Sequence, residues 1–398
     1  MIFFTIALLT LWGMNYKMRT MKTIPLSYIE ISKANVAHNL VSLRGVAKPG
    51  TKFAVAVKGN AYGHGLPEIV RVAEKHVDYF IVNSIEELRE VRKISKKQTF
   101  VLGYVMPSAL GEAIQLGCIL SVFSQTQFLE IEKVAKKMKR TQEVHIACDS
   151  LLGREGFLET ELADFLAIAK KSAHVHISGM YSHFANIEDT NNFTHAQRQI
   201  DAYTRMRALA EKCGYSNLHT HISATSGLLA YEKSSGINTI VRVGIGMYGL
   251  WPSEYLKFEY QKKKLELKPI LSWKTHIAQI KTIPAGRTIG YGLTYMTTKK
   301  TRVALVPQGY ADGFPRALSN KGCVLIGGKK CHVLGRVSMN MFVVDISKCY
   351  DTVESDEVVL LGSQGKSCIT AEEIGEVSGT INYEVTTRIS PLLPRIIV

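Results

Sequence analysis

The chain has 398 residues, of which 46% are hydrophobic and 21% charged, and it carries a formal net charge of +15. Its length predicts two domains, each with its own core, and its ordinary composition excludes a wholly disordered chain. Lysine and arginine are scattered apart from short clusters such as residues 136–140. We therefore expect solvated helix faces and no nucleic-acid partner, in a positive field that favours an anionic small molecule.

The cysteines and the N-terminus say little about fold or function. Seven widely spaced cysteines without a Cys-x-x-Cys pair argue against a disulfide framework and predict no metal site. Residues 1–12 are almost wholly apolar, but basic residues follow them, and they are too few to span a bilayer comfortably. We interpret residues 1–20 as a mis-called extension of a cytoplasmic protein. The alternative is a signal anchor, which would attach the protein to a membrane.

From residue 26 onward, short apolar runs alternate with stretches of helical periodicity, as in repeated βα units. Eight runs are predicted strands: Phe53–Lys58, Tyr79–Asn83, Thr99–Leu102, Leu120–Phe123, Val144–Cys148, Ile177–Tyr181, His219–Ile222 and Thr239–Gly244. Helices are predicted between them, at Leu66–Lys75, Ser84–Lys93, Gln125–Lys139, Glu159–Lys171 and Thr194–Cys213. This rhythm predicts an α/β fold whose N-terminal part is a (β/α)8 TIM barrel.

After about residue 250 the pattern changes to β-rich runs broken by turns such as Gly327-Gly328. We expect a mostly β C-terminal domain there. A highly charged stretch at 257–268 marks the change. We accordingly assign residues 21–255 to the barrel domain and residues 256–398 to the β domain.

The first segment with chemical content is 55–65, Val-Ala-Val-Lys-Gly-Asn-Ala-Tyr-Gly-His-Gly. Lys58 ends an apolar run, so it is expected at the C-terminal mouth of a barrel strand, where barrel enzymes keep their chemistry. Burial there would lower the pKa of the amine, which suits an imine-forming lysine. Taken alone, Lys58 is more simply explained as a lysine that extends to solvent from a strand end.

This segment closely resembles the cofactor-lysine motif of alanine racemases, which are fold-type III pyridoxal-phosphate enzymes with a barrel and a β domain. Further matching segments follow in the same order from about residue 26 to the C-terminus. The resemblance implies that Lys58 holds pyridoxal 5'-phosphate as a Schiff base. It also implies that Tyr62 binds the cofactor phosphate.

Two later barrel segments extend the resemblance. Tyr-Ser-His-Phe-Ala at 181–185 resembles the strand end whose histidine faces the pyridine ring, a role implied for His183. His-Ile-Ser-Ala-Thr-Ser-Gly at 221–227 resembles the phosphate-binding turn, where a hydroxyl and backbone N–H groups at a helix start receive the anion. Thr225 is the implied phosphate ligand.

The segment 241–249 resembles the strand whose arginine binds the pyridine nitrogen, a role implied for Arg242. His221 is expected to brace this arginine, and Gly244 to leave room for backbone contact with phosphate. Because arginine stays protonated, the nitrogen it binds stays unprotonated, and the cofactor is a weaker electron sink than with a carboxylate there. Side reactions such as transamination are thereby limited.

The β domain contributes the remaining matches. Tyr291, in Gly-Tyr-Gly at 290–292, matches the family's second base, which comes from the partner subunit and implies a homodimer. Tyr310 and Arg316 lie in a segment similar to the one that lines the substrate entrance. Met339 is implied in binding the substrate carboxylate through its backbone, and Tyr383 in binding the cofactor phosphate.

Racemisation requires proton removal from one face of the α-carbon and return on the other, so two groups must flank it. Lys58 and Tyr291 are the implied pair. Such groups titrate near pH 10 unless perturbed, so we expect burial and neighbours such as His183 to lower their pKa values. In the family the lysine handles the proton of the D-enantiomer and the tyrosine that of the L-enantiomer.

The clearest departure from the family lies in the segment 144–154. Ala147 stands where many members have a lysine, typically carbamylated, whose negative charge orients the arginine equivalent to Arg154. Arg154 is expected near the cofactor phenolate and the substrate carboxylate, so a bound anion or a neighbouring acid must hold it. Ala224 and Asn340 also replace an asparagine and an aspartate that many members carry.

The implied activity is interconversion of L-alanine and D-alanine, which supplies D-alanine for peptidoglycan. The departures leave open a broad-spectrum racemase for serine, lysine or arginine on the same scaffold. A non-catalytic cofactor carrier would lack the β domain and has no use for Tyr291. A decarboxylase of this fold type usually has a cysteine and different C-terminal motifs.

Overall fold

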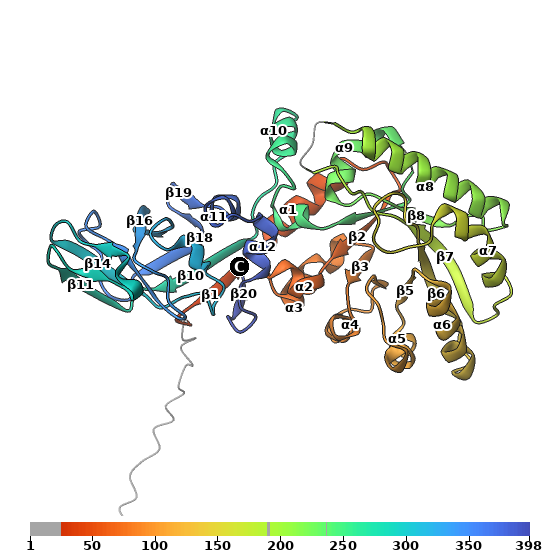
Figure 1. Ribbon diagram of the computed structural model, residues 1–398, viewed down its shortest axis with the longest axis horizontal. Helices are drawn as coiled ribbons and strands as arrows, with labels where there is room; N and C mark the ends of the chain where they lie inside the picture. Colours follow the sequence, from red (N-terminus) through yellow and green to blue (C-terminus); the bar gives the residue numbers. More distant parts are fainter. Residues whose placement is uncertain (1–24, 189–191, 236) are drawn as a thin grey trace, which may run out of the picture.

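The computed structural model describes residues 25–188, 192–235 and 237–398, so the interpretation of residues 1–20 lies outside the described residues. Figure 1 shows an elongated molecule with a barrel ringed by helices at one end and a sheet-rich domain at the other. The predicted fold class is confirmed. No helix in the described ranges is long and apolar enough to cross a bilayer.

The barrel consists of eight parallel strands in the order β8-β7-β6-β5-β4-β3-β2-β9. Each predicted strand is present, with ends that differ by at most a few residues: β2 Lys52–Ala56, β3 Tyr79–Val82, β4 Thr99–Val101, β5 Ile119–Val122, β6 Gln142–Ala147, β7 Val175–Tyr181, β8 His219–His221 and β9 Ile240–Val243. Backbone hydrogen bonds from Thr239 N to Thr220 O (2.9 Å) and from Arg242 N to Ser223 O (2.9 Å) join the β8 and β9 segments.

Helices cover the outside of the barrel: α1 Lys33–Arg44, α3 Leu66–Ala73, α4 Ile85–Arg92, α5 Leu110–Leu116, α6 Gln125–Lys137, α7 Glu159–Ala169, α8 Thr194–Lys212 and α9 Thr225–Ser235. Their start signals are local, since Ser84 and Ser124 cap α4 and α6 by accepting a backbone N–H three residues later. All five predicted helices are confirmed. Helices α1, α5 and α9 were not predicted; α5 has only seven residues and contains Gly111, so its helical signal is weak.

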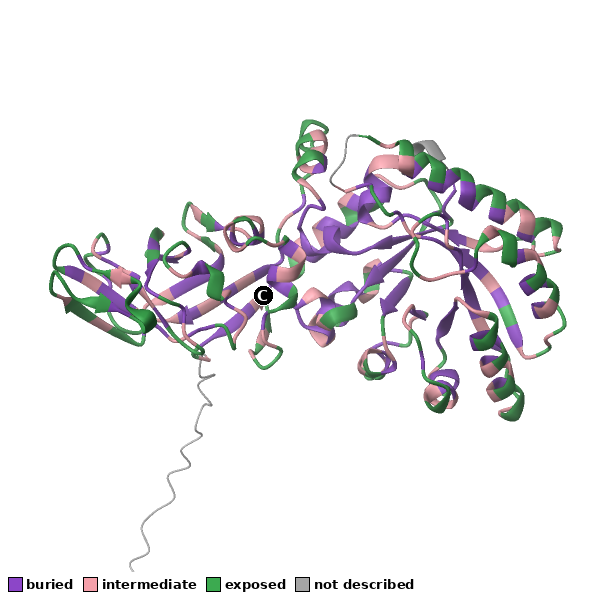
Figure 2. Ribbon diagram, in the orientation of Figure 1, coloured by how far each residue is buried: buried purple, intermediate pink, exposed green. Residues whose placement is uncertain are grey.

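The barrel strands are buried on both faces (Figure 2). This burial explains why their sequences are near-continuous apolar runs. Their outward side chains pack under the helices. The inward side chains form a separate apolar cluster of Ala54, Ala56, Tyr79, Ile81, Phe100, Ile119 and Ile240. Polar inward residues follow it toward the C-terminal mouth of the barrel, so the chemistry lies at that mouth.

The second domain is built on a sheet of order β11-β14-β17-β16-β15-β18-β10-β1-β20, with β19 paired to β18 and a separate β12-β13 pair. Its strands are β1 Tyr28–Ile31, β10 Leu271–His276, β11 Gln279–Ile283, β12 Thr288–Ile289, β13 Tyr295–Met296, β14 Thr301–Val306, β15 Cys323–Ile326, β16 Lys329–Leu334, β17 Phe342–Asp345, β18 Glu357–Gln364, β19 Ser367–Ile369 and β20 Arg395–Ile397. The first described strand, β1, thus pairs with β10 and β20 and not with the barrel.

Three α-helices follow the last barrel strand in the described residues: α10 Glu254–Lys262, α11 Ala371–Ser378 and α12 Asn382–Thr387. Helix α10 lies in the charged stretch expected to separate the domains. Helix α12 packs against the turn that follows β2, so closely that a Cβ on Gly63 would lie 1.8 Å from Thr386 O. This contact carries Tyr383 from the β domain to the mouth of the barrel.

Inside the barrel, Gly179 on β7 lies directly opposite His145 on β6. A Cβ on Gly179 would lie 2.4 Å from His145 Cε1, and His145 is fully enclosed. We expect Gly179→Ala to lower the free energy of unfolding by about 1–3 kcal/mol through overpacking. The midpoint of thermal unfolding, followed by circular dichroism, measures this. Gly111→Ala on α5 is the control, because its Cβ would meet nothing closer than 3.9 Å, and it should not lower the midpoint. Equal midpoints for both variants would contradict the packing argument.

Candidate active site

Lys58 begins a tight turn at the C-terminal end of β2. Four successive residues, Gly59, Asn60, Ala61 and Tyr62, have φ between 52° and 62°, so the backbone forms one left-handed turn. Such a turn costs roughly 1–2 kcal/mol for each residue with a Cβ. Strain of this kind persists only where surrounding contacts hold it, and it is concentrated at functional sites.

Hydrogen bonds to two side chains hold the turn. Glu87 accepts hydrogen bonds from Gly59 N (2.6 Å) and Asn83 N (2.8 Å), which ties the turn to the start of α4. The side chain of Asn60 accepts from Leu66 N (2.9 Å). The amine of Lys58 is therefore carried on a rigid backbone.

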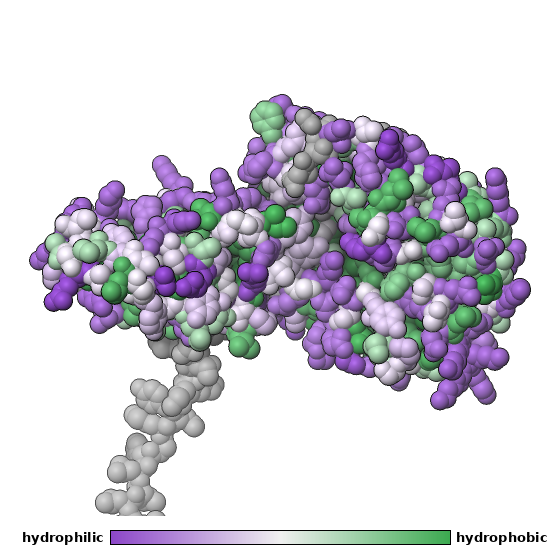
Figure 3. All heavy atoms as spheres, viewed as in Figure 1, coloured by the Kyte–Doolittle hydropathy of each residue, from purple (hydrophilic) through white to green (hydrophobic). Residues whose placement is uncertain are grey.

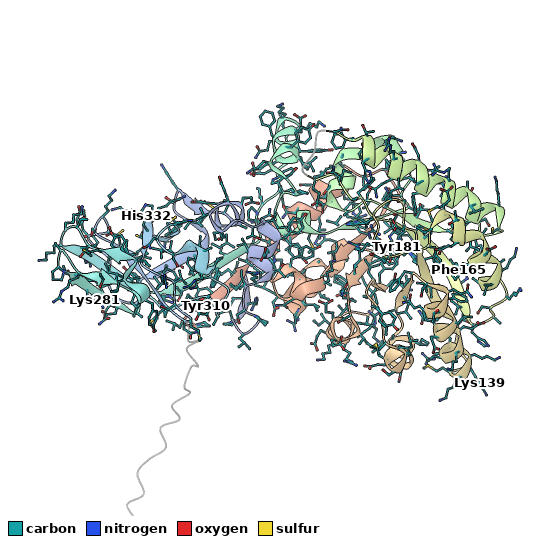
Figure 4. All side chains as sticks on the ribbon, viewed as in Figure 1. Lys139, Phe165, Tyr181, Lys281, Tyr310 and His332 are labelled. Atoms are coloured by element: carbon teal, nitrogen blue, oxygen red, sulfur yellow. The ribbon has the colours of Figure 1, made fainter. Side chains whose placement is uncertain are left out.

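Lys58 lines a cavity at the mouth of the barrel. Most residues expected at the site line it: Lys58, Tyr62, Arg154, His183, Thr225, Arg242, Gly244 and Tyr383. The remaining lining residues are Ala56, Ile81, Leu102, Glu155, Tyr181, Glu188, Ala224 and Ile245. Figure 4 labels Tyr181, which lies inside the ring of barrel strands. The cavity is thus built from at least five βα loops together with α12.

Arg242 on β9 is only 6% exposed and lies at the centre of a buried polar network. It donates to Nδ1 of His221 (3.1 Å), Nδ1 of His183 (3.1 Å) and the Ser182 carbonyl (2.5 Å). His221 Nε2 then donates to Nδ1 of His145 (2.8 Å). Because each Nδ1 accepts, all three imidazoles have their proton on Nε2.

Burial and the adjacent guanidinium lower the pKa of His183 to about 3 and that of His221 well below its ordinary value. Both rings are therefore neutral at pH 7. Burial also lowers the pKa of Arg242 to about 10, which leaves it charged. The positive charge of the network resides on Arg242.

One end of the cavity gathers hydroxyl and N–H groups. Thr225 Oγ1 accepts from Gly244 N (3.1 Å) and Gly246 N (3.3 Å), and a Cβ on Gly244 would lie 2.8 Å from the Tyr62 hydroxyl. Tyr383 places its ring 6.1 Å from that of Tyr62. These residues come from three distant parts of the chain and surround one small space.

A carboxylate already lies at this end. Glu188 Oε1 accepts from Ser226 Oγ (2.7 Å) and from the Tyr383 hydroxyl (3.4 Å). These donors can therefore receive an anionic oxygen. Burial, helped by Glu188, raises the pKa of Tyr62 to about 12, so its hydroxyl stays protonated and can donate.

Ala147, at the end of β6, is buried beneath Tyr181. Tyr181 is its partner in register on β7, and the Tyr181 hydroxyl reaches across β6 to bond Ser121 on β5. The tyrosine also stacks on His221 with ring centroids 5.2 Å apart. Tyr181 thus occupies the space above the small side chain at position 147.

Arg154 follows β6 and forms an ion pair with the next residue, Glu155. Its Nε and Nη2 donate to the two carboxylate oxygens, the second at 2.8 Å. This pairing raises the pKa of Arg154 and lowers that of Glu155. Of the two partners expected for Arg154, a bound anion or a neighbouring acid, the structure shows an acid, and it is the next residue in the chain.

Reduced hydration within the cavity lowers the pKa of Lys58, although the side chain remains accessible through the opening. The positive charges of Arg154 and Arg242 lower it further, while Glu87 and Glu155 oppose them. The sequence suggested His183 as the tuning neighbour. The structure instead makes the two arginines the neighbours that lower this pKa, because His183 is neutral.

Four of the expected residues lie elsewhere. Tyr291 is 73% exposed, Met339 is 56% exposed, and Tyr310 and Arg316 are also exposed, all on the β domain. Figure 4 labels Tyr310 on that domain, well separated from Tyr181 in the barrel. Within one chain the structure does not bring Lys58 and Tyr291 together.

The loops that carry these four residues nevertheless lie side by side. Tyr310 N bonds Ser338 O (3.1 Å), and a Cβ on Gly292 would lie 2.7 Å from Arg336 Cζ. These loops carry an exposed group of large hydrophobic side chains, which we call the tyrosine patch: Tyr291, Leu293, Met296, Tyr310, Met339 and Met341. On the face shown in Figure 3, hydrophilic residues lie over both domains, with hydrophobic residues among them, especially over the barrel.

Sequence reasoning missed three polar residues of the cavity: Glu155, Glu188 and Tyr181. Glu155 had a signal, because it is an acid next to an arginine that lacked a partner. Glu188 and Tyr181 had none, since an acid in a loop and a tyrosine at a strand end have many other uses. In the described residues no group of three or more His, Cys, Asp or Glu could hold a metal ion.

Comparison with known proteins agrees with this architecture. The model for "Alanine racemase, N-terminal domain" matches residues 31–252, and that for "Alanine racemase, C-terminal domain" matches residues 270–397. A curated alanine racemase of Leptospira interrogans is 34% identical over 95% of this chain and 97% of its own length. One from Halothermothrix orenii is 33% identical over 93% and 96%, respectively.

Solved structures show the same likeness. Alanine racemase of Clostridium difficile 630 aligns with a TM-score of 0.88 and 32% identity, covering 95% of this chain and 97% of that one. Alanine racemase of Bacillus anthracis, solved with bound L-Ala-P, aligns with a TM-score of 0.86 and 29% identity, covering 94% and 95%. The match to racemase models and structures over both the barrel and the β domain defines the chain as a racemase. The chain belongs to the alanine racemase family.

The lowered pKa of Lys58 can be measured on the protein without cofactor. We expect its acetylation by acetic anhydride to rise with pH at a midpoint below the ordinary lysine value of about 10.4. Arg154→Gln should move the midpoint up, because it removes a nearby positive charge. Mass spectrometry of the digest reports each lysine, with exposed Lys133 as the internal reference for the reagent. A midpoint at or above the ordinary value would contradict the cavity electrostatics.

Proposed function

We propose that the protein is an alanine racemase that interconverts L-alanine and D-alanine with pyridoxal phosphate as cofactor, in the cytoplasm. Family membership supports the reaction. The observation that carries the proposal for this chain is the cavity itself, in which the Lys58 amine, the Arg242 guanidinium and a group of hydroxyls face one space.

The residues present suit the cofactor. The hydroxyls of Tyr62, Thr225 and Tyr383, with the backbone beside Gly244, are donors suited to a phosphate. Any Cβ at Gly244 would fill part of this space. The Glu188 carboxylate, which already bonds Ser226 and Tyr383, must give way to a phosphate of the same charge sign.

When bound, pyridoxal phosphate supplies a carbonyl carbon that condenses with amines and a ring that withdraws electrons from the α-carbon. We assign Lys58 as the residue that holds it. Arg242, braced by His221, would be a permanent donor to the ring nitrogen, and neutral His183, which Arg242 also contacts, would face the ring. Because Arg242 does not give up its proton, electron withdrawal by the ring stays moderate.

We assign the two proton-transfer roles to Lys58 and Tyr291. The lowered pKa of Lys58 leaves more of its amine able to accept a proton near neutral pH. Arg154 and Met339 are assigned to the substrate carboxylate, and Tyr310 and Arg316 to the entrance. Placing Tyr291 opposite Lys58 requires a second copy of the chain, because in one copy they lie on separate domains.

A homodimer therefore forms part of the proposal. The tyrosine patch supports it, because large exposed apolar groups are a common feature of interaction surfaces. A two-fold arrangement that places each patch over the partner's barrel mouth would complete two sites at once and would be closed. Neither copy alone would have a second base.

Ala147 and Asn340 depart from the residues that many family members carry. A broad-spectrum racemase for serine, lysine or arginine is therefore the alternative function. Kinetics with L-alanine, L-serine and L-lysine distinguish the two activities. We expect the highest kcat/KM for alanine, and a preference for lysine would overturn the proposed substrate.

Exchange of the α-proton with deuterated water tests the two bases separately. Wild type should exchange both enantiomers of alanine. Tyr291→Phe should lose exchange mainly from L-alanine, by about a hundredfold or more, because it removes one acid/base group. Lys58→Ala should lose both, because it removes the cofactor attachment as well as a base. NMR follows the α-proton, and Tyr350→Phe, another exposed tyrosine of the β domain, is the control. Unchanged exchange in both variants would rule out the two-base proposal.

A mixed dimer tests the shared site. Lys58→Ala and Tyr291→Phe chains, each inactive alone, should recover about a quarter of wild-type racemase activity when coexpressed. Half of the dimers then contain both chains, and each of these has one intact site of two. Lys58→Ala coexpressed with Arg154→Gln is the matched control and should recover little, since both residues belong to the same cavity. Recovery in neither mixture would mean that Lys58 and Tyr291 do not come from different chains.

A further inference from the structure

The loop after β6 is shaped to bring two neighbouring side chains into the cavity. In an extended strand, adjacent residues point to opposite faces. Here Gly153 (φ 73°) and Gly156 (φ 123°) flank Arg154 and Glu155, and both side chains line the cavity. A Cβ on Gly156 would lie 2.7 Å from Asp149 N, so the loop closes tightly at that point.

The base of the loop is fixed by hydrogen bonds. Asp149 accepts from Leu152 N (2.9 Å) and Gly153 N (3.0 Å). Phe157 N donates to Ala147 O (2.9 Å), and Asp149 N donates to Phe157 O (2.9 Å). The ion pair at the tip is therefore held by a closed turn attached to the end of a barrel strand.

The charges that line the cavity indicate a role for Glu155. Lys58, Arg154 and Arg242 bring three basic groups to one cavity, whereas His183 is neutral. Of the two lining carboxylates, Glu188 lies at the hydroxyl end, and Glu155 lies against Arg154. Glu155 is the lining acid placed to offset the basic groups at the Arg154 side.

The pairing also leaves part of Arg154 available. Glu155 takes Nε and Nη2, and in the described part of the chain Nη1 of Arg154 makes no hydrogen bond. A guanidinium fixed along one edge is oriented by two parallel bonds. Its remaining N–H groups then have a set direction for a further carboxylate.

We propose that Glu155 is a positioning residue, which fixes Arg154 for the substrate carboxylate and supplies negative charge at the Arg154 side of the cavity. The inference rests on the proposed function, in which Arg154 meets the substrate. With Glu155 in this role, Arg154 needs no separately bound anion to orient it. The residue at position 147 cannot supply the charge, because it is alanine and is covered by Tyr181.

Kinetics with L-alanine and D-alanine test the proposal on the cofactor-loaded protein. Glu155→Gln should raise KM by about tenfold with a smaller change in kcat, because it loosens a group that binds the substrate. Glu155→Asp should retain part of the effect of the acid. Formate added to Glu155→Ala should lower its raised KM by restoring a carboxylate beside Arg154. Glu112→Gln is the matched control, because Glu112 forms a similar two-bond pair with Arg89 (2.5 and 2.6 Å) away from the cavity.

A second measurement needs neither cofactor nor turnover. In the cofactor-free protein, Glu155→Gln should move the acetylation midpoint of Lys58 to lower pH, since a nearby carboxylate favours the protonated amine. Glu112→Gln should leave the midpoint unchanged. A role confined to stability would alter neither this midpoint nor KM.

The outcomes separate the two proposals. Wild-type protein without alanine racemase activity would overturn the proposed function, while the Lys58 midpoint would still report on Glu155. A wild-type KM in Glu155→Gln, or no effect of formate on Glu155→Ala, would overturn the positioning role. Loss of lysine racemisation with unchanged alanine kinetics would also overturn it, by making Glu155 a binder of cationic side chains.

Discussion

The burial of one positive charge, on Arg242, is the constraint on which the interior of the barrel depends. A guanidinium away from water is costly unless its N–H groups are bonded. Here two histidine nitrogens and the carbonyls of Ser182 and Ile222 accept from it. These acceptors come from the ends of β7 and β8, so satisfying Arg242 also fixes the loops that surround the cavity.

That network extends beyond its first neighbours. His221 in turn donates a hydrogen bond to His145. The His145 ring fits because position 179, which faces it, is glycine. Among the described residues the Nε2 of His145 has no hydrogen-bond partner, so this chain of hydrogen bonds ends inside the barrel. Tyr181 stacks on His221 and extends over Ala147 to Ser121. A run of inward residues on five adjacent strands thus supports one charge.

The second organising feature is the separation of basic and acidic groups around the cavity. Burial and the positive charges of Arg154 and Arg242 lower the pKa of Lys58, which favours proton acceptance but raises the cost of gathering like charges. Glu155 offsets part of that cost without sequestering Arg154 from the cavity. The β domain adds Tyr383 through α12, which packs on the strained turn after Lys58, so the position of Lys58 and the contact between the domains depend on the same few residues.

The sequence by itself determined the barrel, because strands buried on both faces carry apolar runs whose spacing is local information. It also identified most of the cavity, since motifs such as the one at Lys58 lie at strand ends, and all barrel strand ends meet at one mouth. Only the tertiary structure decided that β1 belongs to the second sheet, that Tyr181 covers Ala147 and that Glu155 holds Arg154. These outcomes depend on which distant side chains share space and on loop backbone directions, and neither is encoded in local pattern. For the same reason, the exposure of Tyr291 on a separate domain could be seen only once both domains were folded.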